Sequence, residues 1–195
     1  MKSVGIMGGT FDPIHLGHLI TAQAVLELRN LEKIIFIPAF ISPFKTNNPI
    51  LDAAHRLKMI QLSIEGIPYF EFSDIEIRRR TISYTIETIK KMKEIYDNTE
   101  LIIGSDNIIN FKKWKDPDAI LELTKIVVLK RETSIEPKVK DKYYNSAVFV
   151  ETPVIEISSS EIRNKVAKDL PINFLVHEKV KKYIYKNNLY KEKNI

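Results

Sequence analysis

Apolar and amphipathic segments alternate along this chain of 195 residues. Short apolar runs rich in β-branched and aromatic residues predict six strands, over Val4–Met7, Ile34–Pro38, Tyr69–Phe72, Leu101–Ile103, Ile126–Leu129 and Val148–Val150. Apolar residues at helical spacing predict helices over Leu16–Arg29, Ala53–Glu65, Tyr84–Tyr96 and Asp118–Leu123, and two further helices over Ser159–Val166 and Phe174–Tyr185. Strands that alternate with helices favour a parallel sheet covered on both faces.

We therefore predict an α/β fold, a Rossmann-like doubly wound parallel sheet with a small C-terminal helical portion. One domain is expected over residues 1–195, with a Rossmann-like core to about 156, helices over about 157–187 and a basic tail over 188–195. The segments Ala39–Leu51 and Arg131–Asn145 are expected to be loops, and their length suits a part in function.

Composition narrows the classes of protein to consider. Hydrophobic residues make up 44% and charged residues 28%, as in ordinary globular proteins, and no apolar run approaches the ~20 residues of a membrane helix. Lys2 and a short apolar strand do not form a secretory signal, and the absence of cysteine excludes disulfides and suits a reducing cytoplasm. Much of the net charge of +5 lies between Lys179 and Lys193, which is typical of a solvated basic helix. We expect a cytoplasmic protein with no nucleic-acid or membrane partner, and leave a homo-oligomer open.

The segment GGTFDPIHLGH, from Gly8 to His18, connects the first predicted strand to the first predicted helix. In an open α/β sheet this position faces the crevice where ligands bind, and a helix N-terminus there suits a phosphate. Gly8 and Gly9 let a phosphate approach the backbone closely, and the Thr10 hydroxyl can donate to a phosphate oxygen. Asp12 and Pro13 favour a turn before the helix, and Gly17 leaves room beside the histidines. His15 and His18 are three residues apart, so their imidazoles share one face of the first turn.

A second segment, ISSSEIR from Ile157 to Arg163, places three serines at a predicted helix start. Hydroxyl and free N–H groups converge there, and the Arg163 guanidinium can bind a phosphate in bidentate fashion. Taken by itself, Ser158 followed by Glu161 is more typical of a capping box than of a phosphate site. The first segment favours the phosphate interpretation.

Other nucleotide and metal sites find less support in the sequence. The chain has neither the GxxxxGK[ST] of a P-loop nor the GxGxxG of a dinucleotide-binding fold. A zinc pair formed by His15 and His18 would need further ligands from His55, His177 or carboxylates, none of which is close in sequence. We predict no metal ligand among the protein side chains.

Both segments resemble motifs of one superfamily. GGTFDPIHLGH is similar to the GxFDPxHxGH motif, and ISSSEIR to the ISSTxIR motif, of the nucleotidyltransferases that transfer adenylyl and cytidylyl groups. The stretches PFK (Pro43–Lys45), SYT (Ser83–Thr85) and GSD (Gly104–Asp106), with Trp114, narrow the resemblance to the bacterial nicotinate-nucleotide adenylyltransferases. It covers nearly the whole chain. This sequence departs from the family pattern at Phe44, at Glu132–Thr133 and at Ser160.

The resemblance implies a reaction in NAD biosynthesis: ATP and nicotinate mononucleotide give nicotinate adenine dinucleotide and pyrophosphate, with Mg²⁺ accompanying ATP as cofactor. It implies that His15 and His18 are catalytic. The ATP-binding residues it implies are Gly8, Gly9, Thr10, Phe11, His15, His18, Asp106, Ile157, Ser158, Ser159, Ser160 and Arg163. The acceptor-binding residues it implies are Thr10, Lys45, Tyr84, Thr85, Trp114 and Arg131, with the Trp114 indole stacked on the nicotinate ring and the Tyr84–Thr85 backbone at its carboxylate.

Three alternatives stay open at this point. Pantetheine-phosphate adenylyltransferase and glycerol-phosphate cytidylyltransferase share the first motif, although they differ in length and in the second motif. A nucleotide-sensing module without turnover is the third, and intact His15, His18 and Arg163 argue against it because a sensor needs no group placed for transition-state charge.

Overall fold

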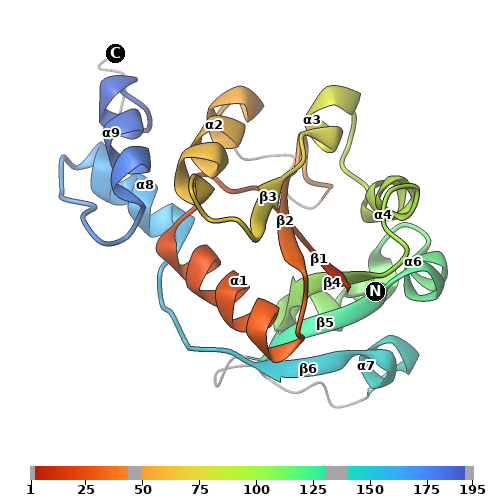
Figure 1. Ribbon diagram of the computed structural model, residues 1–195. Helices are drawn as coiled ribbons and strands as arrows, with labels where there is room; N and C mark the ends of the chain where they lie inside the picture. The colour runs from red at the N-terminus through yellow and green to blue at the C-terminus, as the bar shows by residue number, and fades with distance from the viewer. Residues whose placement is uncertain (1–2, 44–49, 131–139, 192–195) are drawn as a thin grey trace.

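The computed structural model describes residues 3–43, 50–130 and 140–191. Six strands form one parallel sheet in the order β3-β2-β1-β4-β5-β6 (Figure 1). Their bounds are β1 Val4–Gly9, β2 Lys33–Pro38, β3 Phe70–Phe72, β4 Thr99–Gly104, β5 Lys125–Lys130 and β6 Val148–Glu151. The predicted Rossmann-like α/β fold is confirmed, and each predicted strand overlaps an observed one.

Helices cover both faces of this sheet. One face carries α1 (Leu16–Leu28) and α2 (Ala53–Ile64), while α8 (Ser159–Ala167) and α9 (Glu178–Lys186) lie beside these two helices and join the same core. The other carries α4 (Thr85–Lys93), α5 (Ser105–Ile109), the 3₁₀ turn Phe111–Lys113, α6 (Pro117–Leu123) and α7 (Lys142–Ser146), while the short α3 (Ile75–Arg79) lies at the β3 edge. No helix within the described residues is both long and apolar enough to span a lipid bilayer.

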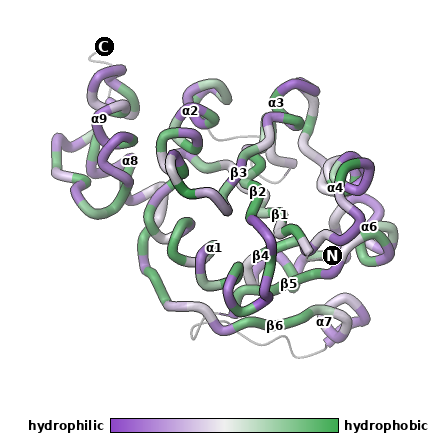
Figure 2. Tube along the Cα trace, in the orientation of Figure 1, coloured by the Kyte–Doolittle hydropathy of each residue, from purple (hydrophilic) through white to green (hydrophobic). Residues whose placement is uncertain are grey.

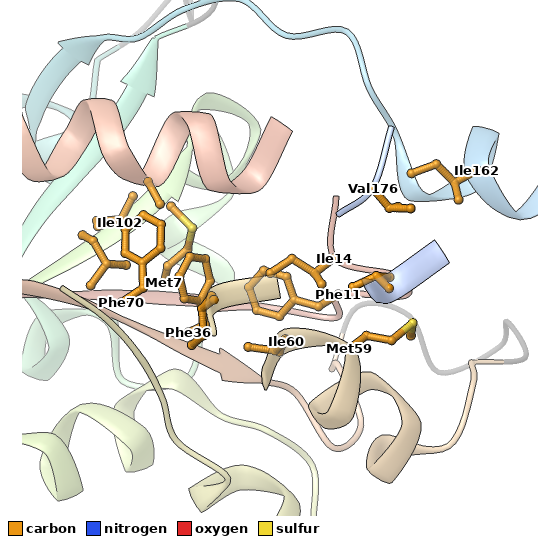
Figure 3. Close-up of a cluster of buried hydrophobic side chains, with 14 of the residues drawn as sticks. Met7, Phe11, Ile14, Phe36, Met59, Ile60, Phe70, Ile102, Ile162 and Val176 are labelled. Atoms are coloured by element: carbon orange, nitrogen blue, oxygen red, sulfur yellow. The ribbon is translucent and has the colours of Figure 1, made fainter. Parts of the chain in front are cut away.

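The strands show why two cores form. Alternate side chains point to opposite faces, so Met7 of β1 joins the cluster under α1 and α2 while its neighbour Ile6 joins the cluster under α4 and α6. Apolar residues follow the inner surfaces of the helices as well as the strands (Figure 2). Figure 3 shows the first cluster, in which Phe11 and Ile14 from the segment after β1 pack toward Met59 and Ile60 of α2.

The differences from the predicted elements are local. The helices α3, α5 and α7 have five residues each, too few to show a helical period in the sequence. All but the last residue of α7 fall within a segment that was expected to be a loop. The last helix begins at Glu178 rather than at Phe174, because Phe174 has a left-handed backbone (φ +62°) and the His177 side chain accepts from the Lys179 N–H to cap the helix.

The end of the described chain also differs from a solvated tail. Leu189 is buried in the first cluster, and Tyr190 packs against it. The predicted basic tail, which was expected to start at residue 188, therefore includes at least two residues that pack on the core. Residues 192–195 lie outside the described chain.

Candidate active site

The first motif lies at the switch point of the sheet. After β1, the chain forms β2 and β3 on one side of β1 in the sheet. It then crosses to the other side of β1, where it forms β4, β5 and β6. The crevice beyond the carboxyl ends of β1 and β4 is where ligands bind in such sheets. The segment Thr10–His15 follows β1, and Asp106 lies exposed in the first turn of α5, directly after β4. The fold thus brings the predicted residues of both strands to one edge.

The two histidines form a stacked pair at the start of α1. Their ring centroids are 3.7 Å apart, and His15, the N-cap residue, is 7% exposed. The His15 main-chain N–H donates to His18 Nδ1 at 3.2 Å. Because an accepting Nδ1 carries no proton, the hydrogen of the neutral His18 ring is on Nε2, which is therefore a donor. The expected sharing of one helical face is confirmed.

Packing explains the glycines of the motif. A Cβ on Gly17 would lie 3.0 Å from His15 Nδ1, so a larger residue would press on the histidine and Gly17 provides the predicted room beside it. A Cβ on Gly9 would lie 2.9 Å from the Phe11 ring, so Gly9 makes space for that ring, while the space at Gly8 is open to a ligand.

Phe11 supports the histidines from the core. Its backbone is left-handed (φ +49°), and its buried ring meets the edges of Phe36 and His18, at centroid distances of 5.9 and 5.1 Å. The predicted contact of Phe11 with ATP would therefore use its main chain. The Phe11 ring itself packs against His18.

The second motif contacts the first. The Ser159 hydroxyl donates to the Pro13 carbonyl at 2.9 Å, and Arg163 Nη1 donates to the Asp12 carbonyl at 2.7 Å. Ser158 caps α8 by accepting from the Glu161 N–H, as predicted. The exposed Ser160 accepts from Arg163 Nη2 at 3.3 Å, and Ile157 packs against the first core. Tertiary structure thus joins two motifs that are 146 residues apart at Ser159 and Pro13.

A buried polar cluster beneath this junction was not predicted. Asp12, taken from the sequence as a turn former, is 5% exposed, and its Oδ1 accepts from the Tyr190 hydroxyl at 2.7 Å. Arg56 of α2 is 1% exposed and donates to the carbonyls of Thr10 and Leu51, at 2.7 and 2.9 Å. Arg56 precedes the buried Met59 and Ile60 by three and four residues. Its place on this apolar stripe was a signal of burial in the sequence.

Two of the predicted acceptor residues lie at the start of α4. Tyr84 is the N-cap of α4 and Thr85 its first residue. The N–H groups of Thr85 and Ile86 have no acceptor within the helix, so this end suits a carboxylate. Two cations that sequence reasoning missed lie here: Lys115 Nζ is 4.4 Å from the Tyr84 ring centroid, and Arg79 Nη1 is 2.9 Å from Glu87. Lys115 also pairs with Glu87, which raises the pKa of Lys115 and lowers that of Glu87.

Hydrogen bonds to polar side chains also anchor the start of α4 to the segment after β2 and to α3. The Phe40 N–H donates to Ser83 Oγ at 2.9 Å, and the Thr88 hydroxyl donates to Glu76 at 2.5 Å. Glu76 is 7% exposed, and burial raises its pKa although hydrogen bonds from Thr88 and Ser83 act in the opposite direction. Ser83 therefore joins the segment after β2 to the predicted acceptor residues.

Trp114 is half-buried, and its ring lies 4.9 Å from that of Phe111 at an angle of 32°. It packs at the border of the second core and stays in part exposed. Lys45 and Arg131, both predicted to bind the acceptor, lie outside the described residues. Within the described ranges, no three His, Asp or Glu side chains gather in a way that could hold a metal ion.

Comparison with known proteins shows the family to which the chain belongs. The family described as cytidylyltransferase-like matches residues 6–165. A protein of Caldicellulosiruptor bescii named "Probable nicotinate-nucleotide adenylyltransferase" is 41% identical over 96% of this chain and 98% of its own. The "Nicotinate-nucleotide adenylyltransferase" of Bacillus subtilis is 38% identical over 97% of this chain and 99% of its own.

A solved structure matches the fold. The nicotinic acid mononucleotide adenylyltransferase of Plasmodium falciparum, solved in complex with NaAD, superposes with a TM-score of 0.80 and is 22% identical. The match covers 97% of this chain and 98% of that one. At this identity the likeness concerns the fold.

Proposed function

The chain belongs to the cytidylyltransferase-like family and, within it, to the nicotinate-nucleotide adenylyltransferases, and from this premise we propose which reaction its site performs and how. The enzyme transfers the adenylyl group of ATP to nicotinate mononucleotide, and nicotinate adenine dinucleotide and pyrophosphate are formed. This reaction belongs to NAD biosynthesis. We place it in the cytoplasm, where ATP is available. A chain without cysteine forms no disulfides and so suits this reducing compartment.

The observation that carries the proposal is the contact between the two motifs at the switch point, through Ser159 to Pro13 and Arg163 to Asp12. It puts the start of α1 and the start of α8 at one edge of the sheet. Two helix N-termini and a guanidinium there suit the triphosphate of ATP.

Charge stabilisation is the main task in the proposed mechanism. An oxygen of the acceptor phosphate attacks the α-phosphorus of ATP in line, a new P–O bond forms, and the bond from the α-phosphorus to the bridging oxygen of the β-phosphate breaks. Pyrophosphate leaves with that electron pair. His18 Nε2 donates to an oxygen of the α-phosphate, and Arg163 stabilises charge on the leaving phosphates. No covalent bond to the enzyme is needed.

ATP enters as its Mg²⁺ complex in this proposal. Mg²⁺ prefers phosphate and water oxygens and retains several waters. The protein residues would hold the phosphates, and the phosphates would hold the ion. This division of roles suits a site built from imidazole, guanidinium and hydroxyl groups rather than carboxylates.

The acceptor would occupy the side formed by α4 and Trp114. The N–H groups of Thr85 and Ile86, which have no acceptor within α4, suit the nicotinate carboxylate. An indole beside a pyridinium ring is favourable by about 0.5–2 kcal/mol. Lys115 and Arg79 outnumber Glu87 and so add positive charge beside an anionic substrate.

Pyrophosphate release with ATP and Mg²⁺ tests the proposal, with nicotinate mononucleotide, nicotinamide mononucleotide and phosphopantetheine offered in parallel. We expect fast release with the nicotinate nucleotide. Release with another acceptor alone would keep adenylyl transfer and overturn the acceptor assignment. An absence of release with all three would favour a nucleotide sensor.

A further inference from the structure

The carboxylate of Asp12 is the point where the end of the chain meets the motif loop, residues Thr10–Pro13 between β1 and α1. Asp12 Oδ1 accepts from the Tyr190 hydroxyl, which is 178 residues away, and Oδ2 accepts from the Leu51 N–H at 3.4 Å. Arg163 Nη1 lies 3.9 Å from Oδ2 and donates to the main-chain carbonyl of the same residue. Three parts of the chain thus converge on one buried side chain.

Tyr190 is built to donate in this position. It follows α9, and its neighbour Leu189 is buried in the first core, with its N–H bonded to the Ile184 carbonyl. Burial and the adjacent Asp12 charge both raise the pKa of Tyr190, so the phenol keeps its proton and donates to the carboxylate. A hydrogen bond to an ionised acceptor in a buried place is among the strong ones.

Three of the four carbonyl oxygens of the motif loop accept hydrogen bonds as well. Arg56 donates to the Thr10 carbonyl, Arg163 to that of Asp12 and the Ser159 hydroxyl to that of Pro13. Carbonyl oxygens left unpaired beside a phosphate would repel it, so donors on these oxygens favour an anion at the loop. Arg56 also donates to the Leu51 carbonyl and at 3.3 Å to that of Phe40, so the same guanidinium fixes the loop's neighbours.

The loop leads directly into the histidines. Asp12 precedes His15 by three residues, and Ile14 between them is fully buried. A displacement of Asp12 would therefore also displace the stacked imidazoles of His15 and His18. Charge-stabilising groups act only within a narrow range of positions, and a displacement of the order of 1 Å costs about 10²-fold in rate.

We propose that Tyr190 is a positioning residue for adenylyl transfer, which acts through Asp12 on the loop that carries His15 and His18. The C-terminal end of the chain is then part of the catalytic unit and not an appendage to it. This inference rests on the proposed function, because it concerns the rate of that reaction.

The test compares Tyr190→Phe, which keeps the ring and removes the hydroxyl, with Tyr185→Phe on the exposed side of α9. Pyrophosphate release is measured with ATP, Mg²⁺ and nicotinate mononucleotide, at a temperature where circular dichroism shows both variants folded. We expect kcat/KM for ATP to fall about tenfold in Tyr190→Phe, the scale of one charge-assisted hydrogen bond. KM for the nicotinate nucleotide should stay the same, and Tyr185→Phe should match the wild type.

A double-mutant cycle with His18→Ala separates positioning from mere stability. If Tyr190 acts through the histidines, Tyr190→Phe has a smaller effect once His18 is alanine, because only the contribution of His15 is left to lose. A tenfold effect in both backgrounds would assign Tyr190 to stability alone and overturn the inference, as would a Tyr190→Phe enzyme equal to Tyr185→Phe. Should Tyr190→Phe not fold, Asp12→Asn takes its place in the same cycle.

The proposed function fails in a different way. A wild-type protein that releases no pyrophosphate with nicotinate mononucleotide contradicts that function before any variant is compared. Turnover by the wild type with no cost from Tyr190→Phe leaves the function standing and removes only the inference.

Discussion

The two sides of the site are held by different kinds of contact. On the nucleotide side, buried Arg56 and half-buried Arg163 donate to main-chain carbonyls of the motif loop, and Asp12 accepts from the far end of the chain. On the acceptor side, Arg79 and Lys115 share the partly exposed Glu87 around the start of α4. Surface ion pairs are worth about 0–1 kcal/mol, whereas breaking a buried one costs several times more.

Because the two sides of the site are held differently, we expect mutations on each side to have different consequences. Groups on the nucleotide side take part in folding, so their loss should affect stability and chemistry together. Groups on the acceptor side should mainly affect binding. The experiments below test the contrast in order of decreasing effect.

Arg56→Met should produce the largest loss of stability, about 3–5 kcal/mol of unfolding free energy, because it leaves Asp12 and three carbonyls without their buried cation. Lys58→Met, on the exposed side of the same helix, should change it by less than about 0.5 kcal/mol. Urea denaturation of both variants measures this. Equal stabilities would remove the contrast between the two sides.

His18→Ala should lower kcat by roughly 10²–10³, the scale for one preorganised group that stabilises transition-state charge. His18→Gln, whose amide can donate from a similar reach, should recover part of the loss. The readout is steady-state pyrophosphate release at saturating substrates. Turnover near that of the wild type in His18→Ala would contradict the catalytic role.

Trp114→Ala should raise KM for nicotinate mononucleotide about 2- to 30-fold, which corresponds to about 0.5–2 kcal/mol of ring stacking. KM for ATP serves as the internal control and should stay within the error of the wild type. An unchanged KM for the acceptor, with a lower melting temperature, would make Trp114 purely structural through its packing on Phe111.

Two glutamates, Glu76 of α3 and Glu87 of α4, should show small pH effects of opposite sign. Burial raises the pKa of Glu76, so its contribution to stability is present in acid and is lost as pH rises through the raised value. Lys115 lowers the pKa of Glu87, so that contribution is present near neutrality and is lost as pH falls through the lowered value. Melting temperatures of Glu76→Gln and Glu87→Gln between about pH 3 and pH 8 compare them. Relative to the wild type, Glu76→Gln should gain with rising pH and Glu87→Gln with falling pH; parallel curves would refute the assignment.

Much of the fold was predictable because it depends on local patterns. The β-branched runs identified the six strands found in the described part of the chain, and the periodic segments identified the long helices. The helices α3, α5 and α7 escaped because five residues hold little more than one helical turn. Phe174 was assigned to a helix by its apolar character, whereas its left-handed backbone and 87% exposure place it in the turn before α9.

The site was predictable where a motif carried it. His15, His18 and Arg163 follow from two segments of sequence, and Ser158 follows from the chemistry of helix caps. Arg79 and Lys115 were missed because a lysine or arginine in a polar stretch has the same pattern whether it faces solvent or folds back on a tyrosine.

The sequence by itself determined the alternation of elements, the two motif segments and the family to which the chain belongs, since these depend on residue types at fixed short spacing. Only the tertiary structure decided that the two segments touch, that Asp12 is buried and that Tyr190 donates to it. Such contacts join residues far apart along the chain, and no local period or propensity records which distant groups meet when the cores close.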